Sequence, residues 1–305
     1  LIFPGQGSQI VGMGSEFYKN FDIVKKIFEE ADKKLKFKIS ELILNGPESS
    51  LKLTQNTQPA ILTVSYSIFK VLVNEFNFKL EEVKYFAGHS LGEYSALLCS
   101  NSIKFSDAIY LLHERGKAMQ EAVPVGKGSM LAVLNLETEQ IRNYISKIDN
   151  KEVCEIANDN ADGQVIVSGD KNSIENLQNL LKKDKKKSIV LPVSAPFHCS
   201  LMKSAADKMK EKIFSVSFEK PSKEIITNVT ATPELDPKKI QNLLVEQIYS
   251  KVRWRESILF MESKNIKEYI EIGPGKVLSG LVKRINRDVK INTINSETDI
   301  RDLKI

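Results

Sequence analysis

The sequence has 305 residues, of which 42% are hydrophobic and 27% charged, and its formal net charge is +5. A chain of this length can bury one large core and a smaller second core, which indicates one or two globular domains. No apolar run approaches the roughly 18 residues that cross a bilayer, so we expect a soluble protein and no membrane partner. The lysines are scattered and there is no arginine-rich arm, so we expect no binding to nucleic acid.

The cysteines and histidines argue against a metal site or a disulfide framework. Cys99, Cys154 and Cys199 lie far apart and form no CxxC pair, which fits a reducing compartment. The three histidines are also unclustered, so we expect no metal site built by the protein. Two glycine-rich stretches, GQGSQI and GPGKV, lack the complete pattern of a dinucleotide fingerprint or a phosphate loop and support no nucleotide cofactor.

Strand and helix patterns alternate along most of the chain. Strands are predicted at the N-terminal LIFPG, at YFAGHS over 85–90, at 224–230 and within 266–277 before a glycine turn. Apolar residues recurring three and four apart predict helices over 16–35, 58–76, 91–100, 105–123 and 200–215, and another from 236 with Pro237 in its first turn. This alternation predicts an α/β fold with a largely parallel sheet.

The middle of the chain has a different order of strands and helices, which predicts a second structural unit. Its order is strand, helix, strand, strand, helix and strand, over 130–136, 137–148, 152–158, 163–169, 173–184 and 187–193. This is the βαββαβ order of a ferredoxin-like unit. We therefore expect a small subdomain over 125–195, inserted into a large domain formed by 1–124 and 196–305.

The strand over 85–90 ends in a serine between two glycines. Gly88-His89-Ser90-Leu91-Gly92 has the G-x-S-x-G pattern, in which small residues let a sharp strand-to-helix turn lift the serine hydroxyl above a sheet. A serine that opens a helix is also a common helix cap. The pattern alone does not separate a nucleophile from a cap.

A serine nucleophile needs a base, and histidine is the usual one. His89 lies inside the motif itself, and His113 falls in a predicted helix, where a lone histidine is more often structural. His198 lies in the proline-broken loop SAPFHCS, after the small subdomain, and such loops commonly carry catalytic groups. We therefore favour His198 as the base.

Arg115 is the third candidate residue. The helix after Ser90 runs about ten residues, and the next helix reaches Arg115 after about ten more. An antiparallel pair of these helices therefore brings Arg115 level with Ser90. A guanidinium there can hold a carboxylate in a two-pronged pair, which suggests an acyl substrate with a free carboxylate. The spacing leaves open the alternative of an arginine on the helix surface.

Six stretches, in one order and spanning nearly the whole chain, resemble malonyl-CoA:acyl carrier protein transacylase. They are PGQGSQ at 4–9, GHSLGEYSAL at 88–97, RGKAMQEAVP at 115–124, PFHCSLM at 196–202, VRW at 252–254 and EIGPGKVL at 271–278. The resemblance implies an α/β-hydrolase-like large domain with a ferredoxin-like insert. It also implies transfer of a malonyl group through a serine ester to the thiol of holo acyl carrier protein, for fatty acid biosynthesis.

The resemblance implies a role for each matching residue. Ser90 attacks the thioester and His198 carries the proton, while the backbone carbonyl at Gln247 orients the histidine in place of an acidic residue. The backbone N–H groups of Gln6 and Leu91 form the oxyanion hole.

On the substrate side, Arg115 pairs with the malonyl carboxylate, and Gln247 and Asn160 are the further substrate-binding candidates. Phe197, beside the histidine, is expected to narrow the acyl pocket in favour of a small malonyl group. No cofactor is expected, because CoA enters as a thioester substrate.

The expected partners are malonyl-CoA and an acidic carrier protein, and the enzyme is expected to be a cytoplasmic monomer, or organellar if a leader has been removed. Three alternatives stay open: a polyketide-type acyltransferase, a serine esterase with the same turn, and a non-catalytic scaffold. The absence of an obvious aspartate partner argues against the esterase.

Overall fold

The computed structural model describes residues 1–148, 152–193 and 195–303. Its main sheet has six strands in the order β10-β9-β1-β2-β7-β8. The bounds are β1 (Ile2–Phe3), β2 (Tyr85–Gly88), β7 (Glu224–Ile226), β8 (Pro233–Glu234), β9 (Glu268–Ile272) and β10 (Lys290–Ile294). The neighbouring pairs from β10 to β7 are parallel, and the edge strand β8 is antiparallel to β7. The predicted α/β fold with a largely parallel sheet is confirmed.

Helices cover both faces of the main sheet, because successive side chains of a strand point to opposite faces. Ile2 packs in one core with Trp254 of α12 (Trp254–Ser263) and with α13 (Val277–Ile285). Phe3 packs in the larger core on the other face. The helices of that larger core include α1 (Ser15–Asn20), α2 (Asp22–Leu35), α5 (Thr54–Asn74), α6 (Gly92–Cys99), α7 (Phe105–Glu121), α10 (Lys203–Phe214) and α11 (Pro237–Gln247).

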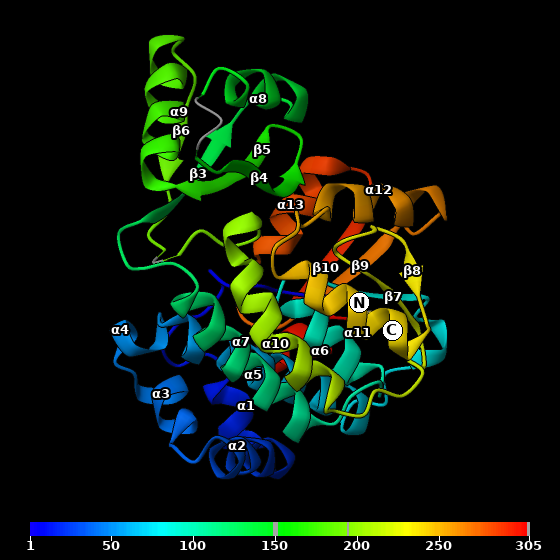
Figure 1. Cartoon of the computed structure of the whole chain (residues 1–305). Helices are drawn as coiled ribbons and strands as arrows, with labels where there is room; N and C mark the ends of the chain where they lie inside the picture. The colour runs from blue at the N-terminus through cyan, green and yellow to red at the C-terminus, as the bar shows by residue number, and fades with distance from the viewer. Residues whose placement is uncertain (149–151, 194, 304–305) are drawn as a thin grey trace.

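The other elements of the main body are short. They are α3 (Ile39–Asn45), α4 (Glu48–Leu51), α14 (Glu297–Arg301) and two 3-10 turns, η1 (Leu80–Glu82) and η2 (Ser200–Met202). Figure 1 shows α1 to α4 in blue at the lower left, away from the small sheet described next.

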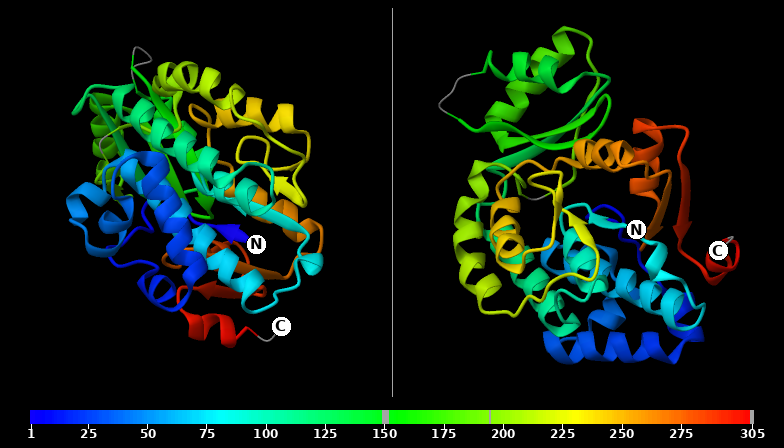
Figure 2. Two further views of the ribbon diagram at one scale, coloured as in Figure 1. Left: turned by 90° about the horizontal axis from the view of Figure 1, so that it is seen from below. Right: turned by 90° about the vertical axis from the view of Figure 1, so that its right-hand side faces the viewer.

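The second sheet has the predicted ferredoxin-like order. Its elements are β3 (Gly128–Leu134), α8 (Thr138–Ile145), β4 (Cys154–Ala161), β5 (Gln164–Asp170), α9 (Lys171–Lys183) and β6 (Ser188–Val190). The strand order is β4-β5-β3-β6 and every pair is antiparallel. This small sheet has its own apolar core and stands off the main body in the side view of Figure 2. The boundaries at 125 and 195 stay a prediction.

Strand β4 joins the small sheet to the main body. Its pairing with β5 shifts register twice, between Ile156 and Asn158 and between Asp159 and Ala161. Between those shifts, the Asp159 N–H donates to Val252 O and the Val252 N–H donates to Ala157 O. Figure 1 shows α13 below β4 and α12 to its right, and both helices contact this strand.

Several predicted elements differ from the observed ones. The helix predicted over 16–35 is two helices, because Phe21 between them has an extended backbone, with φ −126° and ψ 120°. The helix predicted over 58–76 begins earlier, at Thr54. The strand predicted over 224–230 keeps only its first three residues. The chain after 252 holds α12, α13, β10 and α14, which the alternation did not predict.

Candidate active site

Ser90 lies in a tight turn between β2 and α6. Its φ is +53°, in the left-handed region, as expected for a strand-to-helix turn that exposes a hydroxyl. A Cβ at Gly88 would lie 1.9 Å from the carbonyl of Gly92, and a Cβ at Gly92 would lie 2.2 Å from Phe3 O. Glycine is therefore required at both flanking positions by direct backbone contact, which explains the motif.

A hydrogen-bonded chain links Ser90 to His198 and the backbone at Gln247. Ser90 Oγ lies 2.8 Å from His198 Nε2, and His198 Nδ1 lies 2.9 Å from Gln247 O. Because a carbonyl oxygen can only accept, Nδ1 carries the ring proton and Nε2 is left as an acceptor for the serine hydroxyl. The geometry suits an imidazole that removes the proton of Ser90.

His198 is 5% exposed and stays neutral over the physiological range. Burial lowers its pKa to about 3, and the positive charge of Arg115 acts in the same direction. The hydrogen bond to Gln247 O raises the pKa, but by less than burial lowers it. The imidazole is therefore available as a proton acceptor at neutral pH.

Arg115 lies on α7, beside Ser90, where the antiparallel pairing of α6 and α7 was expected to bring it. Its Nη2 donates to Ser90 Oγ at 3.1 Å and to Gln247 Oε1 at 2.9 Å, and its Nη1 donates to Gln58 Oε1 at 2.8 Å. The residue is 1% exposed. Its Nε has no hydrogen-bond partner among the described residues. A buried guanidinium with a spare donor beside a nucleophilic hydroxyl is a suitable place for a carboxylate.

Two buried residues that sequence reasoning missed complete the surroundings of Ser90. Asn228, just after β7, accepts from the Ser90 N–H at 2.7 Å and donates to Gly88 O at 2.7 Å. Glu93 Oε2 accepts from the Asn228 N–H at 3.0 Å and from Gln247 Nε2 at 2.8 Å. Glu93 could have been noticed as the one charged residue in the apolar stretch 91–100, whereas nothing around Asn228 marks it locally.

The expected oxyanion donors are both free to donate. Within the described part of the chain, no backbone hydrogen bond is recorded from the N–H of Gln6 or of Leu91. Leu91 is the first residue before α6, where helix N–H groups are unpaired and the dipole favours negative charge. Gly5 packs directly on His89 O, because a Cβ added at Gly5 would lie only 2.7 Å from this oxygen. The loop that carries Gln6 therefore lies against the Ser90 turn.

The other two histidines have structural contacts. His89 Nε2 lies 2.8 Å from Asn160 Oδ1, and its ring lies 5.7 Å from that of Trp254. His113 Nδ1 donates to Gln55 O at 2.9 Å. Asn160 is therefore brought to the back of the Ser90 turn, and neither histidine is recorded in contact with the Ser90 hydroxyl. Phe197 is buried in the main core beside His198.

A pocket opens beside His198, between the small sheet and the C-terminal end of α11. It has a volume of about 490 Å³, and its lining includes Arg142, Glu155, Tyr249 and Lys251. Of the candidate site residues, only His198 lines it.

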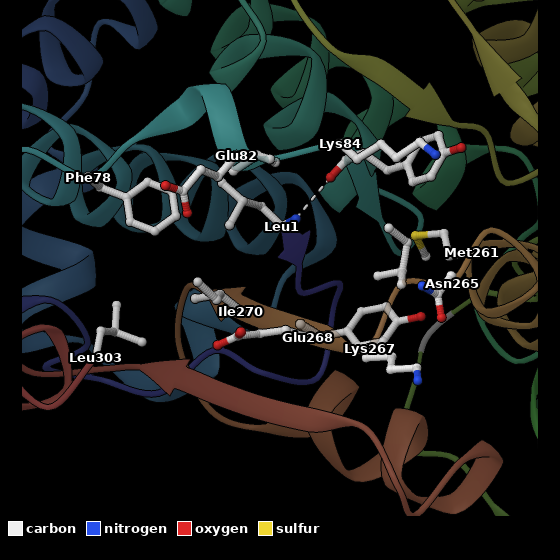
Figure 3. Close-up of a pocket in the computed structure, with 14 residues that line it drawn as sticks. Leu1, Phe78, Glu82, Lys84, Met261, Asn265, Lys267, Glu268, Ile270 and Leu303 are labelled. Atoms are coloured by element: carbon white, nitrogen blue, oxygen red, sulfur yellow. Dashed lines mark hydrogen bonds between the residues drawn. The ribbon is translucent and has the colours of Figure 1, made fainter. Parts of the chain in front are cut away.

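A second pocket, shown in Figure 3, lies at the amino ends of β1, β2 and β9, whereas Ser90 follows the carboxyl end of β2. Leu1, Lys84 and Glu268 line it, and the Leu1 amino group donates to Tyr85 O at 2.9 Å. It contains none of the candidate site residues.

Neither a metal site nor a membrane span is found in the described ranges. Within residues 1–148, 152–193 and 195–303, no group of three or more histidine, cysteine or acidic side chains could hold a metal ion. Over the same ranges, no helix has the length and apolar character needed to cross a bilayer.

At the end of a parallel strand, Ser90 provides a hydroxyl, His198 a neutral imidazole and Arg115 a buried guanidinium. Together with the N–H groups of Gln6 and Leu91, for which no partner is recorded among the described residues, they define a site for acyl transfer through serine. Comparison with known proteins agrees with this class. The sequence model of the acyl transferase domain matches residues 1–299.

Relatives of known name narrow the class. The malonyl CoA-acyl carrier protein transacylase of Bacillus subtilis is 41% identical over 303 residues, covering 98% of this chain and 94% of the relative. The crystal structure of acyl-carrier-protein-S-malonyltransferase from Bartonella henselae superposes with a TM-score of 0.96 at 40% identity, covering 98% and 96% of the two chains. A malonyl-transacylase in complex with a type II PKS acyl-carrier protein superposes with a TM-score of 0.94 at 38% identity, covering 98% and 96%. The chain belongs to the malonyl CoA-acyl carrier protein transacylases of the acyl transferase family.

Proposed function

We propose that this enzyme transfers the malonyl group of malonyl-CoA to the phosphopantetheine thiol of holo acyl carrier protein, supplying malonyl carrier protein for fatty acid biosynthesis. The observation that carries the mechanism is the Ser90 hydroxyl, which lies 2.8 Å from His198 Nε2 and 3.1 Å from Arg115 Nη2. One hydroxyl thus has a base on one side and a carboxylate-binding group on the other. CoA enters as a substrate and no cofactor takes part.

In the first half-reaction, Ser90 Oγ attacks the thioester carbon and its proton passes to His198 Nε2. The tetrahedral oxygen takes the negative charge and accepts from the N–H groups of Gln6 and Leu91. The C–S bond then breaks, and the leaving CoA sulfur takes the proton from His198. The product is a malonyl ester on Ser90.

In the second half-reaction, the carrier thiol gives its proton to His198 and attacks the same ester carbon. The oxyanion is stabilised as before, the C–O bond breaks, and Ser90 Oγ recovers the proton. The carbonyl at Gln247 stabilises the imidazolium in both directions, which is the part that an aspartate takes in serine hydrolases.

Arg115 selects the malonyl group in this proposal. Its guanidinium is buried, so a carboxylate that reaches it makes a charge-assisted pair in a site with little competing water. Gln247 supports the guanidinium by accepting from Arg115, while Asn160, through His89, holds the turn that carries Ser90. Phe197 limits the size of the acyl group.

The carrier partner is proposed to be acidic, since the net charge of +5 steers an acidic protein towards this chain. Transfer to the carrier should then weaken as salt rises, while acylation by malonyl-CoA alone changes less. The enzyme is proposed to act as a cytoplasmic monomer.

Intact-protein mass measurement tests the proposal. Malonyl-CoA alone should leave one malonyl group on the protein, and added holo carrier protein should remove it. Ser90→Ala should abolish the label, whereas Ser95→Ala, which removes a buried hydroxyl on the helix that follows Ser90, should retain it. Labelling of the Ser90→Ala protein would refute the mechanism, and release of the label by water without carrier would favour an esterase.

A further inference from the structure

Gln247 connects the two functional sides of the site. Its backbone oxygen accepts from His198 Nδ1 at 2.9 Å, and its side-chain Oε1 accepts from Arg115 Nη2 at 2.9 Å. The residue is fully buried at the C-terminal end of α11. The orientation of one side-chain amide therefore decides whether Arg115 meets an acceptor or a donor.

Glu93 and the Ser90 carbonyl fix that orientation together, and Glu93 makes the shorter contact. Gln247 Nε2 donates to Ser90 O at 3.1 Å and to Glu93 Oε2 at 2.8 Å, and Oε2 also accepts from the Asn228 N–H at 3.0 Å. Both hydrogen bonds end on Oε2, which accepts whether the side chain is ionised or carries a proton on its other oxygen, so the amide must turn its NH₂ group towards Glu93 and its oxygen towards Arg115. The reversed amide would place oxygen against carboxylate and NH₂ against guanidinium, which are two repulsive contacts in a buried site.

Glu93 is placed for this role and has no contact with the reacting atoms. It lies one helical turn after Ser90 on α6 and is 1% exposed. In the described part of the chain its carboxyl group has no recorded hydrogen bond to Ser90, His198 or Arg115, and its backbone N–H donates to Ser90 O at 3.1 Å. Its charge attracts Arg115 directly, but the hydrogen bond that positions the guanidinium comes from Gln247. The other charged group facing this cluster is Arg115 itself, whose guanidinium also lies 5.9 Å from the centre of the Tyr94 ring.

We propose that Glu93 is a positioning residue for malonyl recognition. By holding the Gln247 amide in one orientation, it keeps Arg115 fixed between Gln247 and Gln58, with its remaining donors free for the substrate carboxylate. This inference rests on the proposed role of Arg115. Acetyl transfer uses no carboxylate contact and therefore depends little on Glu93.

The test compares kcat/KM for malonyl-CoA and acetyl-CoA, with holo carrier protein as acceptor, in full-length variants. Glu93→Met keeps the side-chain volume but removes the acceptor, and the malonyl-to-acetyl ratio should fall by about tenfold or more. Glu93→Gln should keep the ratio within about threefold of wild type, because the Asn228 N–H holds the new amide oxygen where Oε2 was.

Glu271 supplies the matched control. It is also a fully buried carboxylate, and it accepts from the N–H groups of Leu278 and Ser279 at the start of α13, away from the site. Glu271→Met should lower the thermal midpoint and leave the malonyl-to-acetyl ratio unchanged. A general loss of packing is thereby separated from a loss of selectivity.

Each outcome decides the question. If both substrates lose the same factor in Glu93→Met, Glu93 is only structural and the inference is wrong. If Glu93→Met does not fold, Glu93→Asp is measured instead, because the shorter side chain withdraws the acceptor oxygen by one methylene. An unchanged malonyl-to-acetyl ratio in Glu93→Asp overturns the inference. Arg115→Ala is measured alongside: an unchanged ratio in that variant would refute the proposed role of Arg115 itself. A reduced ratio there, with an unchanged ratio in Glu93→Met, would refute only the positioning role.

Discussion

Asn160 Oδ1 lies 2.8 Å from His89 Nε2, so a residue of the small sheet holds the turn that carries Ser90. Burial lowers the pKa of His89, which keeps the ring neutral, and Trp254 packs against it. The next residue back along β4, Asp159, is anchored to the main body as well. Arg255 on α12 donates to its two carboxylate oxygens, each at 3.0 Å. The placement of the small sheet and the geometry of the Ser90 turn are therefore coupled.

This coupling predicts that Arg255→Ala is destabilising. Asp159 is 1% exposed and would be left as a buried carboxylate without its cation, so the free energy of unfolding in urea should fall by about 2 kcal/mol or more. As a control, Arg301→Ala removes a solvent-exposed pair with Glu297 and should lower the free energy of unfolding by much less, because exposed ion pairs contribute little. Equal losses in the two variants would show that the Arg255 pair does not brace the small sheet.

Asn228 leads to a second prediction. Its side chain accepts from the Ser90 N–H and donates to Gly88 O, which holds the turn at a positive φ that serine rarely adopts. Asn228→Ala should slow acylation by malonyl-CoA by about ten- to a hundredfold, through the rate constant more than through KM. The measurement is single-turnover acylation followed by mass spectrometry. Asn242→Ala, on the exposed side of α11, should change neither, and a KM effect alone in Asn228→Ala would contradict the assignment.

The contrast between Arg115 and Asn228 shows what the sequence can reveal. Arg115 could be placed because α6 and the part of α7 before Arg115 are similar in length, so an antiparallel pair joined by a short turn returns the chain to its starting level. Asn228 lies 138 positions from Ser90, and only the parallel pairing of β2 with β7 brings it close. The break at Phe21 was missed for a related reason, since the apolar periodicity continues through a residue whose backbone is extended. Contacts set by tertiary pairing leave no local periodicity to detect.

Two buried groups beside Gln247, His198 and Glu93, make folding stability depend on pH in opposite directions. Burial, followed by the charge of Arg115, lowers the pKa of His198 from 6.5 to about 3, so in that window only the unfolded chain binds the proton and stability falls as pH drops. Burial raises the pKa of Glu93 from 4.5 to about 7, so in that window only the folded chain binds the proton and stability falls as pH rises. Between pH 4.5 and 6.5 the two dependences oppose each other.

Glu93→Gln removes one of these dependences and leaves the other. Relative to wild type, the variant's free energy of unfolding should rise by about 1 kcal/mol per pH unit between pH 4.5 and 7. Urea unfolding at a series of pH values measures this difference. A difference that does not vary with pH would mean that Glu93 has the same pKa in the folded and unfolded chains.

The last prediction concerns Arg115, whose guanidinium touches Ser90 Oγ, Gln58 and Gln247 at once. Arg115→Ala should cost malonyl transfer about 2–5 kcal/mol of transition-state stabilisation, because the malonyl carboxylate then enters a buried site unpaired. Acetyl transfer should stay the same or improve. Arg115→Lys should rescue malonyl transfer only in part, because a point charge cannot contact Gln58, Gln247 and a carboxylate together.

The control for Arg115 is Arg142→Ala, which removes a positive charge from the pocket beside His198 without touching Ser90. If Arg115 acts by direct pairing, kcat/KM in the Arg142 variant should change by a similar factor for malonyl-CoA and acetyl-CoA, because both carry the same CoA group. Only the Arg115 variants should change the ratio between them. If Arg142→Ala lowers the malonyl-to-acetyl ratio as far as Arg115→Ala does, selectivity comes from the general positive potential of the cleft, and the direct pair with Arg115 is not its source.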